Sequence, residues 1–454
     1  MRLNDPAQPI WTSRFFFLMA SIGFAVGLGN IWRFPYVAGE SGGGAFVLLY
    51  LLFAFSIGIP IVIAELLIGK RGRAGSVGSV RALVKEESLS PLWIAIGYLN
   101  QVAALLIQVT YAVIAGWVLF YFSRALTEGF VQITPLLAAA DYEDITKNFF
   151  ASLFWTSSSI FICGLILYFG LKSGIERAVG FMMPTLFFVM VLLITFNIFA
   201  GGFKDGLVWL FEPDFSKITP QVCLAALAQA FFSIGVAMAV MTTYGSFLPQ
   251  ETNIFSSAFI IVFADTLVAI LAGLVIFPVV FSGNLDPAAG PGLIFQVLPV
   301  AFAGMPGGYF FGVFFFLLLS VAAITSMLGL LESLVRWVEI EFSFSRKKAT
   351  TCVILFNTVL SGLSVGAYSG IVSGGNFYSS LNDRIDYISN QVLLPLGGML
   401  IAVFVGWFIN LRVIQKDYVV VDNRIFTIWK FFLRWPVPIA VFIILLTGVL
   451  PIQS

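Results

Sequence analysis

The sequence contains no histidine and only three cysteines, and only 10% of its residues are charged. The lack of histidine excludes a histidine metal ligand, a histidine proton shuttle and a Ser–His catalytic pair. The cysteines lie in separate apolar stretches without metal-ligand spacing, so we expect Cys163, Cys223 and Cys352 to be packing residues. The net charge of +1 argues against a nucleic-acid partner. No nucleophile–base pair or cofactor motif is visible, so the sequence does not indicate an enzyme.

Apolar side chains, in contrast, are abundant. Of the 454 residues 59% are hydrophobic, and the mean hydropathy is +1.00. A soluble protein cannot bury that much apolar surface, so we expect an all-α polytopic membrane protein. No cleavable signal is predicted, because the first apolar run is a full span. We predict eleven spans, near residues 15–37, 43–69, 92–125, 149–170, 176–200, 221–248, 254–282, 309–341, 348–369, 387–411 and 430–451.

Charges in the loops favour one orientation in the membrane. Lys and Arg gather after the second, fourth, eighth and tenth spans, whereas the opposite loops, such as 141–144 and 204–214, are richer in acid. The positive-inside rule therefore predicts a cytoplasmic N-terminus, and an odd number of spans puts the C-terminus outside. The expected location is the plasma (inner) membrane. Membrane lipid is then an expected partner, and homo-oligomerisation is left open.

The first span contains an unusual stretch, Ser21–Pro35, with the sequence SIGFAVGLGNIWRFP. Three glycines are followed by Asn30 and Arg33, a pattern that predicts a break in the helix. An unpaired backbone group costs several kcal/mol in hydrocarbon, so a break at mid-depth is tolerated where it lines a cavity and coordinates something. The alternative is a flexible helix whose small residues serve packing.

A second interruption lies in the sixth span, at Ser233-Ile-Gly235 within Gln229–Gly245. Breaks at matching positions of two five-span halves indicate an inverted-repeat transporter. The predicted organisation is a cytoplasmic N-terminus (1–14), a first repeat (15–200), a second repeat (201–411), and a cytoplasmic loop with the eleventh span (412–454).

Four stretches, AVGLGNIWRFPY, GGGAFV, YAVIAGW and QAFFSIG, resemble the neurotransmitter:sodium symporter family, and the resemblance covers nearly the whole chain. It implies a LeuT-like fold, with a 5+5 inverted repeat, broken helices 1 and 6, and an eleventh span. It also implies a sodium-coupled secondary active symporter that imports amino acids by alternating access, with two sodium ions as the expected coupling ions.

The resemblance implies two sodium sites made of oxygen ligands, which a hard cation prefers. The expected residues of sodium site 1 are Ala25, Asn30, Ser233 and Asp265. Those of sodium site 2 are Gly23, Val26, Ala322, Thr325 and Ser326. The alternative for the last two is that their hydroxyls bond back to their own helix.

Asp265 lies well inside the seventh span, where an ionisable side chain is costly and by default functional. The family often has Asn here, and its chloride-dependent members add a bound chloride. Tyr50, Gln229 and Ser233 match that chloride region, but one turn after Asp265 stands Ala269. We infer that the carboxylate replaces the anion, so no chloride is expected. A protonated Asp265 would also allow return of a proton; the alternative is a structural, permanently neutral acid.

The expected substrate is a free hydrophobic amino acid. Monoamine carriers of this family place an Asp where Gly27 stands here, so the substrate must bring its own carboxylate. That carboxylate would meet the backbone at the first break, the Tyr111 hydroxyl and sodium. The expected substrate-binding residues are Phe24, Ala25, Gly27, Gly29, Ile107, Tyr111, Phe232, Ser233, Gly235, Met238, Ser326 and Leu330. The alternative for the apolar ones is ordinary helix packing.

Gates are expected on both sides of this site. The extracellular gate is predicted from Arg33 and Asp386, with Phe232 and Tyr111 beneath them and Gln229 bracing Arg33. On the cytoplasmic side the family's Arg falls at Gln8, its acidic partner at Ile340 and a supporting Tyr at Phe247. Something else must therefore close this side, and Arg2 or Glu339 are candidates. Glu65 resembles the acid that bonds the unwound sixth helix.

Gly174 and Pro184, ten residues apart at the fifth span, resemble the motif that lets this helix unwind toward the inner sodium. A simple proline kink is the alternative. Two rival functions remain: a non-transporting amino acid sensor, supported by the altered inner gate, and a chloride-coupled osmolyte carrier, which Asp265 and the apolar pocket argue against.

Overall fold

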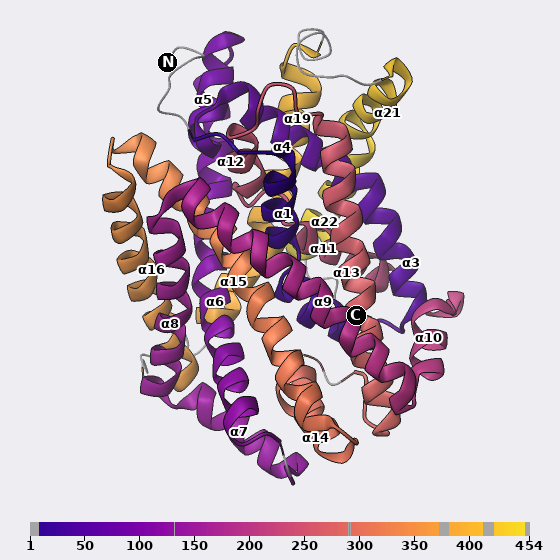
Figure 1. Ribbon diagram of the computed structural model, residues 1–454. Helices are drawn as coiled ribbons and strands as arrows, with labels where there is room; N and C mark the ends of the chain where they lie inside the picture. The colour runs from indigo at the N-terminus through magenta and orange to yellow at the C-terminus, as the bar shows by residue number, and fades with distance from the viewer. Residues whose placement is uncertain are drawn as a thin grey trace.

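The computed structural model describes residues 9–130, 132–288, 290, 292–371, 381–411 and 422–449, and every regular element in that part is a helix (Figure 1). The α-helices are α1 (Arg14–Ala25), α2 (Phe34–Glu40), α3 (Gly44–Phe53), α4 (Ile59–Gly72), α5 (Gly75–Glu86), α6 (Ala95–Thr127), α7 (Pro135–Lys147), α8 (Phe149–Tyr168), α9 (Arg177–Ala200), α10 (Phe203–Phe211), α11 (Pro220–Ile234), α12 (Val240–Ser246), α13 (Ile254–Ser282), α14 (Leu298–Gly304), α15 (Gly308–Glu341), α16 (Arg346–Ser369), α18 (Leu381–Tyr387), α19 (Leu394–Val403), α21 (Asn423–Arg434) and α22 (Pro436–Val449).

Short wider or tighter helical turns join several of these helices into continuous rods. The wider, π-type turns are η1 (Gly29–Arg33), η2 (Ala54–Gly58), η4 (Leu171–Glu176), η6 (Leu293–Val297), η7 (Ile388–Leu393) and η8 (Phe404–Phe408). The tighter, 3₁₀-type turns are η3 (Pro91–Ile94) and η5 (Phe215–Lys217). Wider turns of this kind often occur at functional sites.

The predicted spans correspond to these helices. In the described part nine helices are long and apolar enough to cross a membrane, and a tenth crossing is the bent pair Arg14–Ala25 and Gly29–Glu40. The sixth predicted span, 221–248, is present as two short pieces, α11 and α12, separated by residues 235–239. The eleventh predicted span, near 430–451, corresponds to the end of the amphipathic helix α21 and the apolar helix α22, and the helical segment already begins at Asn423. Charged residues on its amphipathic first turns hid the start.

Local sequence explains where these helices begin. The Asn253 side chain accepts a hydrogen bond from the Ser256 amide at the start of α13, at 3.0 Å. Thr219 caps α11 in the same way, and Pro220 occupies the first position of that helix, where no amide donor is required. These caps satisfy backbone groups that would otherwise be unpaired at the helix ends.

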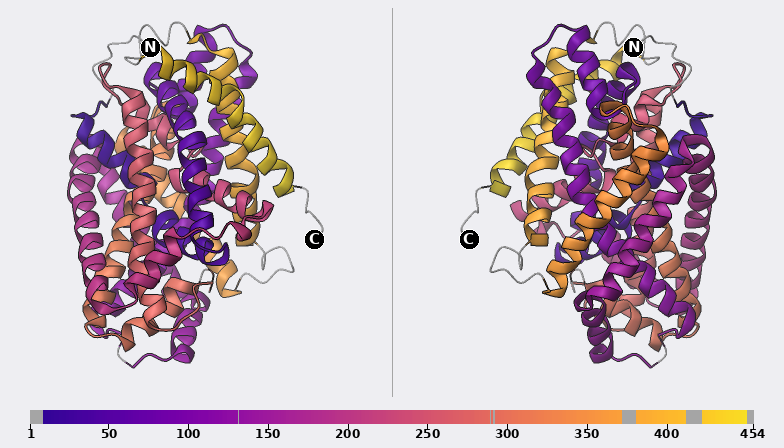
Figure 2. Two further views of the ribbon diagram at one scale, coloured as in Figure 1. Left: turned by 90° about the vertical axis from the view of Figure 1, so that its right-hand side faces the viewer. Right: turned by 90° about the vertical axis from the view of Figure 1, so that its left-hand side faces the viewer.

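The helices form one bundle with the interrupted segments inside it (Figures 1 and 2). The start of the described chain, α5 and α21 lie at one end, while α7 and α14 lie at the opposite end (Figure 1). The two breaks face α6, α13 and α15, whose facing side chains are buried. This packing lets non-helical backbone sit inside the bundle, away from lipid.

Candidate functional site

The first break separates α1 from η1 at Val26–Leu28, and the two halves are bent by 45°. Its backbone is held by side chains as well as by other backbone groups. The Gly27 amide donates to the Asn30 side-chain oxygen at 3.2 Å, and the Leu28 amide donates to the Tyr111 hydroxyl at 2.9 Å. All four residues are buried, so the break is a built part of the interior.

The second break lies between α11 and α12. Three of its five residues, Gly235, Ala237 and Ala239, have positive φ angles of 71°, 60° and 62°. Left-handed backbone costs an alanine about 1–2 kcal/mol, and strained backbone of this kind gathers at functional sites. Glu65 of α4 is fully buried and lies beside the backbone amide of Ala237. The predicted interruption of the sixth span is therefore confirmed.

A buried polar cluster joins the two breaks to α13. The Asn30 side-chain amide donates to Asp265 Oδ1 at 2.7 Å and to Ser233 Oγ at 3.0 Å. Ser233 Oγ donates to Asp265 Oδ2 at 2.9 Å, and the Tyr50 hydroxyl lies 3.3 Å from the same oxygen. These four side chains are between 0 and 2% exposed. Three of the four residues expected at sodium site 1 thus form one hydrogen-bonded group, and Ala25 is at the end of α1 beside it.

The residues expected at sodium site 2 come from α1 and α15, which pack against each other. Ser326 Oγ crosses between them and donates to the Phe24 carbonyl at 2.8 Å, with the Gly23 carbonyl 3.4 Å away. The Thr325 hydroxyl instead donates to the Val321 and Ala322 carbonyls of its own helix. The back-bonding alternative raised from the sequence therefore describes Thr325 but not Ser326.

The structure brings all twelve residues expected to bind substrate around one small cavity of about 20 Å³. They come from both breaks and from α6 and α15, and the set is Phe24, Ala25, Gly27, Gly29, Ile107, Tyr111, Phe232, Ser233, Gly235, Met238, Ser326 and Leu330. Most of their side chains are apolar or small, while the hydroxyls of Tyr111, Ser233 and Ser326 supply polar atoms.

Two glycines are needed to form this cavity. A Cβ on Gly27 would collide with Ser326 Oγ and would lie 2.5 Å from the Tyr111 hydroxyl. A Cβ on Gly235 would lie 2.5 Å from the ring of Phe24, and its positive φ also disfavours a side chain. A side chain at Gly27 would therefore have to displace the Ser326 and Tyr111 hydroxyls, and this position offers no carboxylate for an amine.

A larger cavity of about 460 Å³ lies next to the small one, on the side that holds α7, and Tyr142 of α7 is part of its lining. Ile107, Tyr111 and Phe232 line both cavities and separate them. Arg33 and Asp386 face this larger cavity. Arg33 donates to Gln229 at 3.2 Å and its guanidinium lies 4.6 Å from the Phe232 ring centre, while Asp386 accepts from Asn390 at 2.6 Å. Within the described residues the expected gate pair is thus engaged with other partners.

The opposite side is closed by packed aromatic rings. Trp11 is 2% exposed, and its backbone amide donates to the Phe247 carbonyl at 3.0 Å. Its indole N–H donates to the Tyr244 carbonyl at 3.1 Å, and the two rings meet edge to face at 5.3 Å. The segment before α1 therefore docks on the end of α12 and seals this side of the site.

An ion-pair network lies beside this seal, between α15 and α16. Arg346 makes two hydrogen bonds to the buried Glu332 and lies 3.8 Å from Glu339, which also pairs with Arg336 at 3.2 Å. The Arg336 guanidinium is 5.7 Å from the ring centre of Phe247. Glu339, one candidate for the inner gate, thus belongs to a network that contacts the seal.

The other inner-gate positions are partly described. Ile340 would be 3.6 Å from a side chain on Gly75, so it packs against the start of α5. Gln8 and Arg2 lie outside the described residues.

The fifth span begins with a wider turn that also touches the seal. Glu176, 4% exposed, accepts a hydrogen bond from the Thr12 amide at 2.8 Å. Gly174 lies in the same turn, η4, where a side chain would collide with the Ile166 carbonyl, and Pro184 lies inside α9. The two motif residues are therefore placed at the start and within the first turns of the fifth span.

Sequence reasoning missed Glu176 and Glu332. Both carry a signal that was available, because a carboxylate at the start of or inside an apolar span is rare without a partner. The partner could not be read from the sequence, since Glu176 and Thr12 are separated by 164 residues.

Comparison with known proteins agrees with this geometry. The model of the Sodium:neurotransmitter symporter family matches residues 8–133 and 147–454. An uncharacterized sodium-dependent transporter of Haemophilus influenzae is 33% identical over 99% of this chain and all of its own length. The uncharacterized sodium-dependent transporter YhdH of Bacillus subtilis is 33% identical over 98% of each chain.

A solved structure has the same fold. The crystal structure of MhsT in complex with L-phenylalanine superposes with a TM-score of 0.89 at 38% identity, covering 97% of this chain and all of the other. The expected LeuT-like architecture, with broken helices 1 and 6, is therefore confirmed. With a family match over nearly all its length and relatives above 30% identity, the chain belongs to the sodium:neurotransmitter symporter family of sodium-dependent membrane transporters.

Proposed function

We propose that this sodium-dependent symporter imports hydrophobic amino acids and does not require chloride. The observation that carries the proposal is the Asp265 carboxylate, fully buried among Asn30, Ser233 and Tyr50 at the meeting point of the two broken helices. A sodium ion bound here brings one positive charge, and this carboxylate is a fixed negative charge able to balance it. The bound anion that chloride-dependent relatives need is then unnecessary.

The lining of the small cavity supports a hydrophobic substrate. Phe24, Ile107, Phe232, Met238 and Leu330 surround the space for a side chain, and none of them has a hydrogen-bond donor. The substrate carboxylate would bind at the first break, where backbone amides meet the Tyr111 hydroxyl. The related MhsT was crystallised in complex with L-phenylalanine, a hydrophobic amino acid.

Two sodium ions would bind at the sites assigned from the sequence, with Thr325 turning its hydroxyl away from its own helix to act as a ligand. Each charge moved through 100 mV supplies about 2.3 kcal/mol, so two ions drive strong accumulation. The open outer cavity and the closed Trp11 side represent one end state of alternating access. The organisation as two repeats, 15–200 and 201–411, with a cytoplasmic N-terminus, belongs to the same proposal.

The deciding experiment is uptake of labelled leucine into proteoliposomes under an inward sodium gradient, with chloride replaced by gluconate. We expect uptake that needs sodium and survives the loss of chloride. The matched control replaces sodium by potassium on both sides. Binding without accumulation would identify a sensor, and loss of uptake without chloride would overturn the role given to Asp265.

A further inference from the structure

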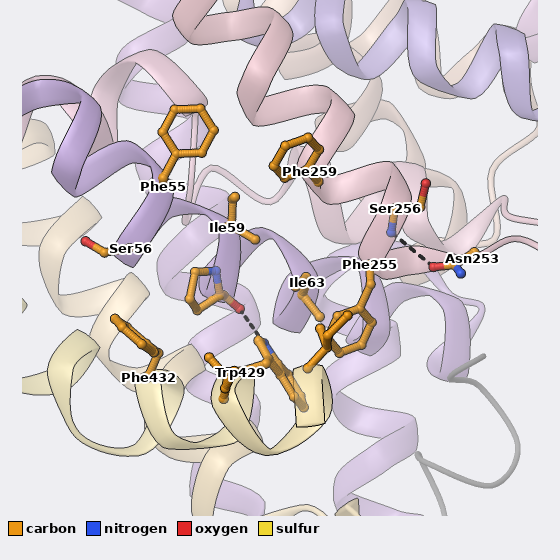
Figure 3. Close-up of a pocket in the computed structure, with 13 residues that line it drawn as sticks. Phe55, Ser56, Ile59, Ile63, Asn253, Phe255, Ser256, Phe259, Trp429 and Phe432 are labelled. Carbon is orange, nitrogen blue, oxygen red and sulfur yellow. Dashed lines mark hydrogen bonds between the residues drawn. The ribbon is translucent and has the colours of Figure 1, made fainter. Parts of the chain in front are cut away.

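A third cavity, of about 450 Å³, lies on the outer surface of the helix bundle and takes no part in the proposed transport cycle. Three segments enclose it: the η2–α4 junction, the start of α13, and α21 (Figure 3). We call it the α21 groove. Its lining is mostly apolar and consists of Phe55, Ser56, Ile59, Pro60, Ile63, Asn253, Phe255, Ser256, Phe259, Ile425, Ile428, Trp429 and Phe432.

The groove opens toward the hydrocarbon of the membrane. Phe259, Ile425 and Ile428 are each more than half exposed, and the left view of Figure 2 looks onto this face, where α21 lies beside α4. The indole N–H of Trp429 is already bonded to the Pro60 carbonyl at 3.1 Å. The floor of the groove therefore presents aromatic and aliphatic surface, which favours a flexible apolar chain.

The polarity of the groove is concentrated at one end. Asn253 and Ser256 lie there, away from Phe55 in Figure 3. The exposed Arg14 reaches this end and donates to Ser256 Oγ at 2.7 Å and to Ser257 Oγ at 3.2 Å. The other hydroxyl in the lining, Ser56, donates to the Leu52 carbonyl of its own helix and offers little to a ligand. The apolar slot thus ends at the Ser256 hydroxyl, to which the Arg14 guanidinium is bonded.

We propose that the α21 groove binds one acyl chain of an anionic phospholipid, whose phosphate lies against Arg14. The chain fills the apolar slot, and the headgroup meets the cation where the slot ends. The partial positive charge at the start of the 29-residue α13 acts in the same direction. This end also holds α5, so the lipid comes from the leaflet on that side (Figure 1).

Native mass spectrometry of the purified full chain tests this, with phosphatidylglycerol and phosphatidylethanolamine added in equal amounts. We expect retained phosphatidylglycerol to exceed phosphatidylethanolamine. Arg14→Gln should reduce that preference by about fivefold, which corresponds to one basic residue at a membrane surface. Arg177→Gln, which removes another exposed Arg at the same end, should leave the preference unchanged.

The slot itself is tested by filling it. Ile428→Trp should lower retention of both lipids by about tenfold or more, because each methylene kept out of an apolar site costs about fourfold in affinity. Ile439→Trp is the matched control, since Ile439 is exposed to a similar degree on α22 but does not line the groove. Equal retention in both variants would overturn the proposal.

Photo-crosslinking uses the unmodified chain, so its result does not depend on whether the variants fold. A phosphatidylglycerol with a photoreactive group on its acyl chain should label peptides of α13 and α21. Labelling spread evenly over the exposed helices would overturn the proposal. So would a dimer that dissociates on Ile428→Trp, because a second copy of the chain would then cover the groove.

Discussion

At the scale of single residues, the feature with the largest consequence is the charge of Asp265. Its neighbours Asn30, Ser233 and Tyr50 all offer hydrogen bonds to its carboxylate, but none of them carries a charge. A buried carboxylate without a positive partner is costly, and a bound sodium ion would supply that partner. In the proposed function, Asp265 therefore couples ion binding to the arrangement of the two breaks.

Replacing Asp265 by Asn keeps the shape of the side chain and removes its charge. We expect the sodium concentration for half-maximal leucine uptake to rise by about tenfold or more, since a bond to a charged group contributes about 1.5–3 kcal/mol. Sodium titration of uptake in proteoliposomes measures this. Asp144→Asn, in the exposed part of α7, is the control and should change nothing. A normal sodium response in the Asp265 variant would remove it from the ion site.

Phe24 sets the size of the small cavity. Its ring occupies the space in front of Gly235 and Gly329. Phe24→Ala should therefore favour larger substrates. The affinity for tryptophan relative to leucine, measured by competition, should improve by about tenfold, which is the usual effect of one or two methylene groups in an apolar pocket. Phe16→Ala, on α1 facing Gly180, serves as the control. An unchanged order of preference would place the substrate elsewhere.

At the scale of elements, a hydrogen bond ties the fifth span to the inner seal. The Glu176 carboxylate holds the Thr12 amide next to Trp11, so unwinding of η4 and release of Trp11 should occur together. The π-type geometry of η4 and the glycine within it make this turn easy to rearrange. The proline of the motif, Pro184, weakens the helix further along.

Glu176→Ala should loosen the seal. A cysteine introduced at Ser246, in a background without the natural cysteines, should react about tenfold faster with a thiol reagent, because a charge-assisted bond of about 1.5–3 kcal/mol is lost. Glu176→Gln keeps an acceptor for the amide and should have a much smaller effect. If both variants react equally, or neither differs from the parent, Glu176 does not hold the seal.

The ion-pair network between α15 and α16 is expected to stabilise the folded protein. Glu332 is 1% exposed and holds Arg346 through two hydrogen bonds. Glu332→Ala should destabilise the folded protein by about 3–5 kcal/mol, because the Arg is left without its partner. Thermal unfolding in detergent measures the change. The double variant Glu332→Leu with Arg346→Met should recover most of it, and failure to recover would mean that the effect is one of packing alone.

At the scale of the whole molecule, the orientation in the membrane is a prediction from loop charges. A cleavable tag fused before residue 1 should be protected in intact cells, while one fused after residue 454 should be cut by added protease. Permeabilised cells, in which both tags are cut, provide the control. Cleavage of the first tag alone would invert the topology and exchange the outer and inner cavities.

Much of the fold could be predicted because long apolar runs identify membrane helices in a sequence. The breaks were also predictable, since Gly27 and Gly235 stand among glycines and polar residues that a plain span does not need. Boundaries were harder, and the helical start at Asn423 lies before the predicted one because charged residues in α21 interrupt the apolar run. The twelve cavity residues came from the family resemblance, and their meeting around one space could be seen only in three dimensions.

The sequence by itself determined that the chain lies in a membrane, how many segments cross that membrane, and the two places where helices break. These features depend on local composition. The tertiary structure decided which partner each polar group takes. The Thr325 hydroxyl bonds to its own helix, whereas the Ser326 hydroxyl bonds across to α1. Arg33 donates to Gln229 and lies over the ring of Phe232. The tertiary structure also joined Glu176 to Thr12 and made the α21 groove from three distant segments. Such choices depend on distances between residues far apart in the chain, which only packing fixes.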